Sequence, residues 1–185
     1  MKKLLYPILL SFLLFSCKSN KSFLQTNAQD WFIGGDAKWK FEQGEIIGTV
    51  ADGNGFIMSR DVHTDFLLTL EFYPDSTINS GVFIGCANRE INPTDCYELN
   101  IWDLHPNQNF RTGAFVTKAP PLSYVETINK WNTYEIKMKD KHITAKINNK
   151  IVVDMETNDR NAGFYALQAA NTGEIRFRKI VFQIL

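Results

Sequence analysis

Short segments in which apolar and polar residues alternate constrain the fold of this chain most strongly. Residues 66–73 read Phe-Leu-Leu-Thr-Leu-Glu-Phe-Tyr, and residues 97–102, 134–138 and 143–147 alternate in the same way. Turn residues separate such segments at Gly34-Gly35, Asp52-Gly53-Asn54-Gly55, Asn79-Ser80-Gly81, Pro120-Pro121, Asn148-Asn149 and Asn171-Thr172-Gly173. We find no long helical periodicity and no repeat. This pattern predicts an all-β fold, a two-sheet antiparallel β-sandwich.

Two local features predict how particular strands begin and end. Asn148-Asn149 lies between two apolar alternating segments and is typical of a tight hairpin. In the last strand the alternation runs through Ile175 and Phe177 and then changes phase to Ile180 and later residues. We therefore expect a β-bulge near Arg178-Lys179.

The composition fits one neutral domain of ordinary size. The 185 residues include 20 Lys plus Arg and 20 Asp plus Glu, so no strong field favours nucleic acid as a partner. Aromatic residues make up 13% of the chain and suit both strands and flat binding platforms.

The N-terminus has the features of an export signal. Lys2 and Lys3 precede an apolar run over residues 4–15, too short for a comfortable membrane span, which ends at Ser16-Cys17. This ending resembles a bacterial lipobox, in which the Cys is lipidated; an ordinary secretory signal is the alternative. We expect residues 1–17 to be a lipoprotein signal peptide, 18–29 a tether and 30–185 a single domain. No acidic residue occurs in residues 18–21, which favours a membrane-anchored position on the periplasmic side over the cell surface.

Two further cysteines, Cys86 and Cys96, lie near the ends of strand-like segments joined by a short loop. In an oxidising compartment they would form a disulfide, and two buried free thiols are the alternative. Neither has a spaced Cys or His partner that would indicate a metal site.

The polar faces of two strands suggest a binding groove. Glu71 and Tyr73 share the second face of residues 66–73, and Glu98, Asn100 and Trp102 share that of residues 97–102. We expect these side chains to meet in one polar, aromatic hollow. A plain solvated outer face is the alternative.

An ordered set of motifs resembles a known family. It comprises Trp39-Lys40-Phe41, Gly44-Glu45-Ile46-Ile47-Gly48, Asp65-Phe66 with Glu71, Asn79-Ser80-Gly81-Val82, Tyr97-Glu98 with Asn100 and Asp103, Thr112-Gly113-Ala114, Trp131-Asn132, Leu167-Gln168 and Phe177-Arg178. The set is similar to the 3-keto-disaccharide hydrolase, or 3-keto-glucoside-1,2-lyase and hydratase, domain family, formerly a domain of unknown function. The resemblance covers residues 31–185 and implies a concanavalin A-like jelly roll among exported bacterial proteins.

The resemblance also implies a chemistry. In a 3-keto sugar the hydrogen on C2 is acidic, so a carboxylate can remove it, the oxygen on C1 can leave, and water can add back. Glu98 is the expected base and Glu71 the second catalytic carboxylate. The expected substrate-binding residues are Asn79, Asn100, Trp102, Asp103 and Gln168.

The chain departs from the family pattern at several positions, including Asn100 where many members have Gln, which leaves other functions open. Phe83-Ile84-Gly85 occupies the stretch where many members carry an Arg, and Ala169-Ala170 replaces a His after Leu167-Gln168. A non-catalytic carbohydrate-binding lipoprotein and an interaction module are therefore alternatives. No cofactor is expected, although Ca²⁺ or another divalent metal fits sandwiches of this kind, and Asp103 with His105 could bind a metal or relay a proton.

Overall fold

The computed structural model describes residues 22–24, 27–158 and 162–185, the first of these ranges by its backbone alone. The expected signal peptide and the lipidation site Cys17 lie outside the described residues.

The described chain consists of β-strands joined by turns and two short 3-10 helices. The strands are β1 (Ser22–Leu24), β2 (Trp31–Gly35), β3 (Lys38–Glu42), β4 (Glu45–Val50), β5 (Asn54–Ser59), β6 (Phe66–Pro74), β7 (Ile78–Cys86), β8 (Tyr97–Ile101), β9 (Asn132–Lys139), β10 (His142–Ile147), β11 (Lys150–Glu156), β12 (Phe164–Asn171) and β13 (Gly173–Ile184). The 3-10 helices are η1 (Ala28–Asp30) and η2 (Gln108–Phe110).

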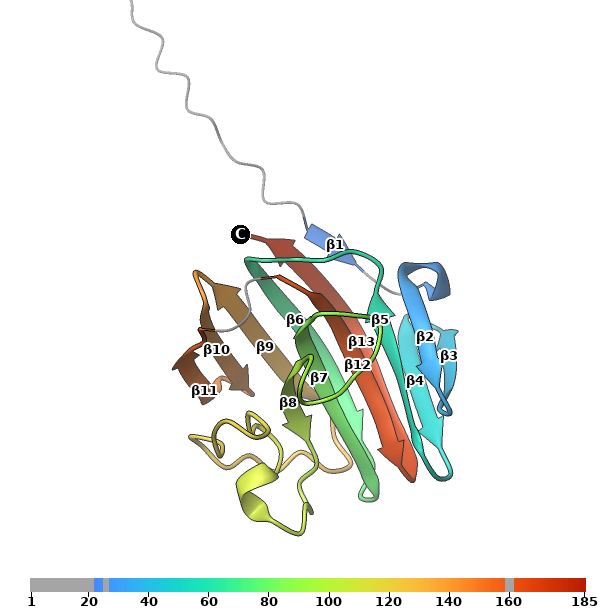
Figure 1. The fold of residues 1–185 in the computed structure, drawn as a ribbon. Helices are drawn as coiled ribbons and strands as arrows, with labels where there is room; N and C mark the ends of the chain where they lie inside the picture. The colour runs from blue at the N-terminus through green and yellow to red at the C-terminus, as the bar shows by residue number, and fades with distance from the viewer. Residues whose placement is uncertain (1–21, 25–26, 159–161) are drawn as a thin grey trace, which may run out of the picture.

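Within these residues the strands form two antiparallel sheets that pack face to face (Figure 1). The larger sheet has eight strands in the order β11-β10-β9-β6-β13-β4-β3, with β1 paired to β13. The smaller sheet has five strands in the order β2-β5-β12-β7-β8. This arrangement confirms the predicted two-sheet antiparallel β-sandwich.

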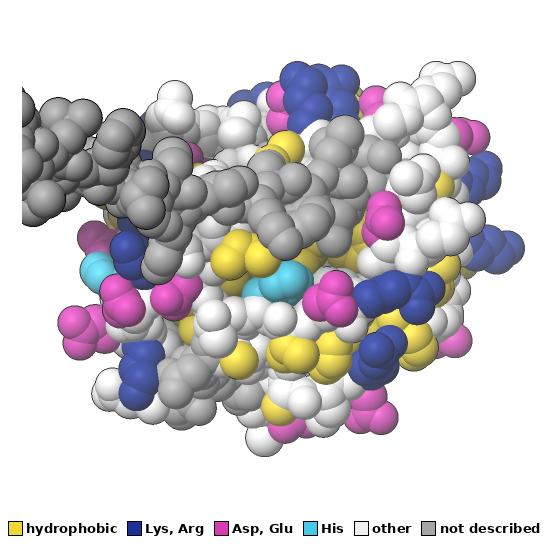
Figure 2. Space-filling view, turned by 90° about the horizontal axis from the view of Figure 1, so that it is seen from above, with side chains coloured by type: hydrophobic (Ala, Val, Ile, Leu, Met, Phe, Trp, Pro, Cys, Tyr) yellow, Lys and Arg dark blue, Asp and Glu magenta, His cyan; other side chains and the backbone are white. Residues whose placement is uncertain are grey.

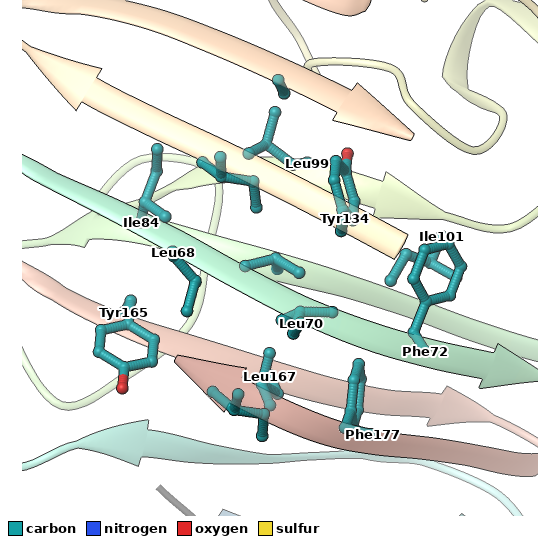
Figure 3. Packing of buried hydrophobic residues seen from close by; sticks show 14 of the residues in the cluster. Leu68, Leu70, Phe72, Ile84, Leu99, Ile101, Tyr134, Tyr165, Leu167 and Phe177 are labelled. Carbon is teal, nitrogen blue, oxygen red and sulfur yellow. The ribbon is translucent and has the colours of Figure 1, made fainter. Parts of the chain in front are cut away.

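The alternation seen in the sequence fills the space between the sheets. The residues of β6 are buried and half-buried in strict alternation, with Leu70 and Phe72 facing the interior. Leu99 and Leu167 of the smaller sheet face them, as Figure 3 shows. Each such fully buried side chain stabilises the fold by about 1.5–3 kcal/mol relative to exposure.

The predicted hairpin and the predicted bulge are both confirmed. Asn148 and Asn149 connect β10 to β11 with φ angles of 48° and 65°, values that Asn tolerates better than most residues. The register of β13 against β6 shifts between Arg178 and Val181, where Lys179 has a φ of 50°. The bulge lets the strand keep its apolar residues inside on both sides of the phase change.

The sheet begins earlier in the chain than the expected domain boundary at residue 30. Ser22 pairs with Gln183, so part of the expected tether adds a short strand to the edge of β13. β1 and the C-terminus lie at one end of the sandwich, and the long segment between β8 and β9 lies at the opposite end (Figure 1).

The face of the molecule seen in Figure 2 agrees with the balanced composition. Figure 2 views the molecule from the end where β1 lies, and acidic and basic side chains are interspersed over that face. None of the described residues forms a helix with the length and apolar character needed to cross a membrane.

Candidate functional site

The candidate site lies on the outer face of the five-stranded sheet. Tyr97, Leu99 and Ile101 of β8 point into the core, so Glu98 and Asn100 point outward. Asn79 of β7 lies on the same outer face. Ala170 pairs with Asn79, which places Gln168, two residues earlier in β12, diagonally beside it.

The chain after β8 folds back over this face and forms a wall. The returning segment runs beside β8, where the Gly113 N–H donates to the Asn100 carbonyl at 2.9 Å and the Val116 N–H donates to the Glu98 carbonyl at 3.0 Å. Gly113 has a φ of 87°, a conformation that favours glycine. The return brings Phe110 and Val116 over the outer face of the sheet.

Sheet and wall border an open cavity of about 150 Å³. The described residues that line it are Asn79, Glu98, Asn100, Trp102, His105, Phe110 and Val116. Sites for drug-sized ligands measure about 300–1,000 Å³, so this cavity suits one small ring. Two larger hollows, of about 420 and 300 Å³, are lined mainly by exposed residues such as Lys137 and Asp52.

Glu98 contributes a carboxyl group to the lining of the cavity. Its carboxyl group is half-buried, and none of the described residues donates a hydrogen bond to it or forms an ion pair with it. Burial without a compensating charge raises the pKa of Glu98 to about 7. A carboxyl group with this pKa can exchange a proton near neutral pH.

Two amide oxygens on this outer face, one from Asn79 in the cavity lining and one from Gln168 outside it, have no partner within the described structure. Oδ1 of Asn79 and Oε1 of Gln168 are both buried and accept no hydrogen bond. The Gln168 Nε2 group donates to Oδ1 of Asn54 at 3.1 Å, which fixes the orientation of the amide. Buried acceptors without donors are uncommon in proteins, and a ligand rich in hydroxyl groups would satisfy them.

His105 also lines the cavity, a position that the sequence did not predict. Its ring lies edge-on to Trp102, with centroids 4.4 Å apart, and its Nδ1 accepts a hydrogen bond of 3.0 Å from the Asn107 N–H. The sequence signal was the closeness of His105 to Trp102 along the chain.

Asp103 does not share the cavity, contrary to the expected substrate-binding role and the expected pairing with His105. Its two carboxylate oxygens accept hydrogen bonds from Thr127, one from the backbone N–H at 2.6 Å and one from Oγ1 at 2.8 Å. Asp103 therefore braces the loop against a later segment of the chain.

Asn100 lines the cavity, but its amide group is engaged with the backbone. Nδ2 donates to the Phe110 carbonyl, and Oδ1 accepts from the Ile101 N–H at 3.0 Å. Asn100 therefore holds the wall in place. Trp102 presents its half-buried ring to the cavity.

Glu71 lies on the opposite side of the molecule, and the expectation that it shares a hollow with Glu98 is wrong. Glu71 belongs to β6 of the eight-stranded sheet, where its carboxylate accepts from Arg178 Nε at 2.6 Å and from Lys179 Nζ at 2.7 Å. The hydrogen bond from Lys179 contributes most to lowering the pKa of Glu71. The alternation correctly predicted that both carboxylates point away from the core, but they lie on the outer faces of different sheets.

The disulfide expected as one of two alternatives is present between Cys86 and Cys96. The loop that it closes packs Ile91 against a second apolar cluster on the outer face of the five-stranded sheet, which includes Phe83 and Ala166. Ile91 is not among the residues that line the cavity. The loop thus covers the apolar part of the face and leaves the part with Glu98 open.

The sequence alone allows a divalent metal at Asp103 and His105. The described ranges contain no group of three or more His, Cys, Asp and Glu side chains placed to hold a metal ion.

Comparisons with known structures identify the fold. A candidate glycosyl hydrolase from Parabacteroides distasonis is 21% identical, with a TM-score of 0.75 over 90% of this chain and 100% of the other. A second from the same organism is 16% identical, with a TM-score of 0.71 over 85% and 89%. The carbohydrate-binding module CBM66 from Bacillus subtilis is 14% identical, with a TM-score of 0.63 over 82% and 94%. At these identities the similarity shows a shared sandwich fold.

No curated protein matches the sequence. A family model described as the 3-keto-alpha-glucoside-1,2-lyase-like domain matches residues 20–183, nearly all of the described chain. The protein therefore belongs to the 3-keto-alpha-glucoside-1,2-lyase-like domain family.

Proposed function

We propose that the protein cleaves glycosidic bonds of 3-keto sugars by elimination and hydration, with Glu98 as the base. The observation that supports this most directly is the Glu98 carboxyl group, which pairs with none of the described residues and lines an open cavity of about 150 Å³. The family match agrees with this substrate class.

The cavity suits the first step of such a reaction. The ketone at C3 makes the hydrogen on C2 acidic, and a base with a pKa near the working pH removes it most effectively. Glu98, with a pKa of about 7, meets this requirement. After the proton leaves C2, the oxygen on C1 can depart, and water then adds to C1.

The lining residues suit a sugar ring. Trp102 offers an aromatic surface to the apolar face of a pyranose. The free Oδ1 of Asn79 is an acceptor, and sugar hydroxyl groups are donors. Gln168 is not among the residues that line the cavity.

The decisive experiment compares the wild type with Glu98→Gln on 3-keto-glucosides. We expect turnover to fall by about 10²–10⁴-fold, the usual contribution of a general base. Glu71→Gln is the matched control, because it makes the same chemical change on the other sheet. Equal turnover by wild type and Glu98→Gln would remove Glu98 from the mechanism.

A carbohydrate-binding lipoprotein without catalysis is the second candidate. The fold shared with CBM66 and the open cavity favour it. Measurable sugar binding by calorimetry, with no product from any 3-keto-glycoside, would identify this function.

We further propose that the protein is exported and anchored to the membrane through Cys17, on the periplasmic side. The lipobox-like ending of the N-terminal apolar run supports this location.

A further inference from the structure

Removal of the C2 proton places negative charge on the 3-keto oxygen, and a catalyst needs a hydrogen-bond donor there. Among the described lining residues, three side chains have N–H groups that are not engaged with the backbone: Asn79, Trp102 and His105. Of these, the imidazole N–H is the most acidic, so it forms the strongest hydrogen bond to an enolate.

The structure fixes where the proton of His105 lies. A backbone N–H can only donate, so the 3.0 Å hydrogen bond from Asn107 occupies the lone pair of Nδ1. The neutral imidazole therefore carries its proton on Nε2. No other described residue forms a hydrogen bond with Nε2, which leaves this N–H available to a ligand in the cavity.

The ring is also held in position before any ligand binds. It packs edge-on against Trp102 and against Phe110, with the centroid of the latter 5.6 Å away. Its backbone N–H donates to the Trp102 carbonyl at 3.3 Å, and its carbonyl accepts from Gln108 Nε2 at 2.8 Å. A donor held in this way needs no reorganisation when charge develops.

We infer that His105 is a catalytic residue that donates its Nε2–H to the 3-keto oxygen of the substrate and stabilises the enolate. The inference rests on the proposed function, because it assigns a second role in the same cavity. It replaces the metal or proton-relay role that its closeness to Asp103 had suggested.

The reaction balances without a proton from His105. Glu98 takes the C2 proton, and the electron pair of that bond forms the enolate, whose oxygen His105 holds. The enolate collapses, the C1–O bond breaks, and the leaving oxygen takes a proton from water. The hydroxide left behind adds to C1, and the new enolate recovers its C2 proton from Glu98. The net reaction is hydrolysis.

The test measures enolate formation alone. A 3-keto sugar without a leaving group at C1 exchanges its C2 hydrogen for deuterium in D₂O, a reaction that needs a base and an electrophile. We expect His105→Phe, which keeps the aromatic packing, to slow this exchange by about 10²–10³-fold, the usual effect of removing one such donor. His105→Gln retains an N–H donor and should recover part of the rate.

Controls separate this role from a structural one. His142→Phe changes an exposed histidine of the other sheet and should exchange deuterium at the wild-type rate. Binding of the same sugar to His105→Phe should change less than the exchange rate does, and its unfolding midpoint should match the wild type. Exchange by His105→Phe at the wild-type rate overturns this inference alone. A wild type that exchanges no deuterium overturns the proposed function, and the inference with it.

Discussion

The carboxyl group of Glu98 lies against the backbone of Gly81 on the neighbouring strand. A β-carbon added at Gly81 would lie 3.2 Å from Oε1 of Glu98, closer than an ordinary contact. The glycine leaves room for the carboxyl group to lie close to the sheet. The position of Glu98 therefore depends on a residue with no side chain.

The variant Gly81→Ala should displace Glu98 while the protein still folds. We expect turnover of 3-keto-glucosides to fall by roughly 10- to 100-fold, because small misplacements of a catalytic group are costly. The overpacking should destabilise the fold by about 1 kcal/mol. Steady-state kinetics and urea unfolding measure the two effects. In a Glu98→Gln background, Gly81→Ala should reduce turnover little further, because the two substitutions act on the same carboxyl group. If the two substitutions reduced turnover independently, Gly81 would not act through Glu98.

Glu98→Gln should stabilise the protein at alkaline pH. The folded-state pKa of about 7 is above the ordinary value of 4.5, so the folded state binds more protons than the unfolded state between these values. The favourable contribution of Glu98 is complete below pH 4.5 and is lost as pH rises through 7. We expect Glu98→Gln to be more stable than wild type by about 3 kcal/mol at pH 8 and equal at pH 4.

Thermal unfolding across this pH range measures the difference. Glu156→Gln, at an exposed position of β11, is the matched control and should follow the wild type. A Glu98→Gln variant with no gain at pH 8 would show that the carboxyl group is not desolvated.

Glu71→Gln should leave turnover unchanged and weaken the fold. It removes the partner of Arg178 and Lys179 on the far sheet, at a cost of about 1 kcal/mol at pH 7. Because these cations lower the pKa of Glu71, its stabilising effect is present above the unfolded-state pKa and lost as pH falls through the folded-state pKa. Unfolding at pH 7 and under strongly acidic conditions checks this sign. A large loss of turnover would contradict the placement of Glu71 outside the site.

Removing the disulfide should destabilise the protein by about 3 kcal/mol, the chain-entropy value for a loop of this length. Cys86 and Cys96 are 10 residues apart, and Cys96 lies two residues before Glu98. Urea unfolding of the Cys86→Ala/Cys96→Ala variant and of the oxidised wild type measures this difference in the free energy of unfolding. Equal stabilities would mean that the loop is ordered without the cross-link.

Cys17→Ser should release the protein from the membrane fraction, because no lipid can then be attached. Fractionation of expressing cells, followed by immunoblotting, measures the change. The segment between β8 and β9 lies at the end of the sandwich opposite to β1, so the released protein should keep its activity (Figure 1). A membrane-bound Cys17→Ser protein would refute lipidation at this residue.

Much of the fold follows from local patterns in the sequence. Period-two alternation identified the buried face of β6, the Asn148-Asn149 pair identified a hairpin, and the phase change in β13 identified a bulge. Each of these features is encoded within a few consecutive residues, so it can be read without knowledge of distant contacts.

The candidate site was only partly predictable, because it depends on which strands become neighbours. Alternation shows that Glu71 and Glu98 both point away from the core, but it does not show that their strands belong to different sheets. The roles of Asp103 and His105 could not be predicted either. Asp103 accepts a hydrogen bond from Thr127, which is distant in sequence. Contacts across long sequence separations decide such cases.

The small volume of the cavity has a consequence for selectivity. If this hollow of about 150 Å³ holds the oxidised ring, as the proposed function requires, the alcohol attached at C1 must stay outside in bulk solvent. The protein would then select substrates by the oxidised ring and would discriminate little between the alcohols attached to it. One such protein could process many different glycosides after a common oxidation step.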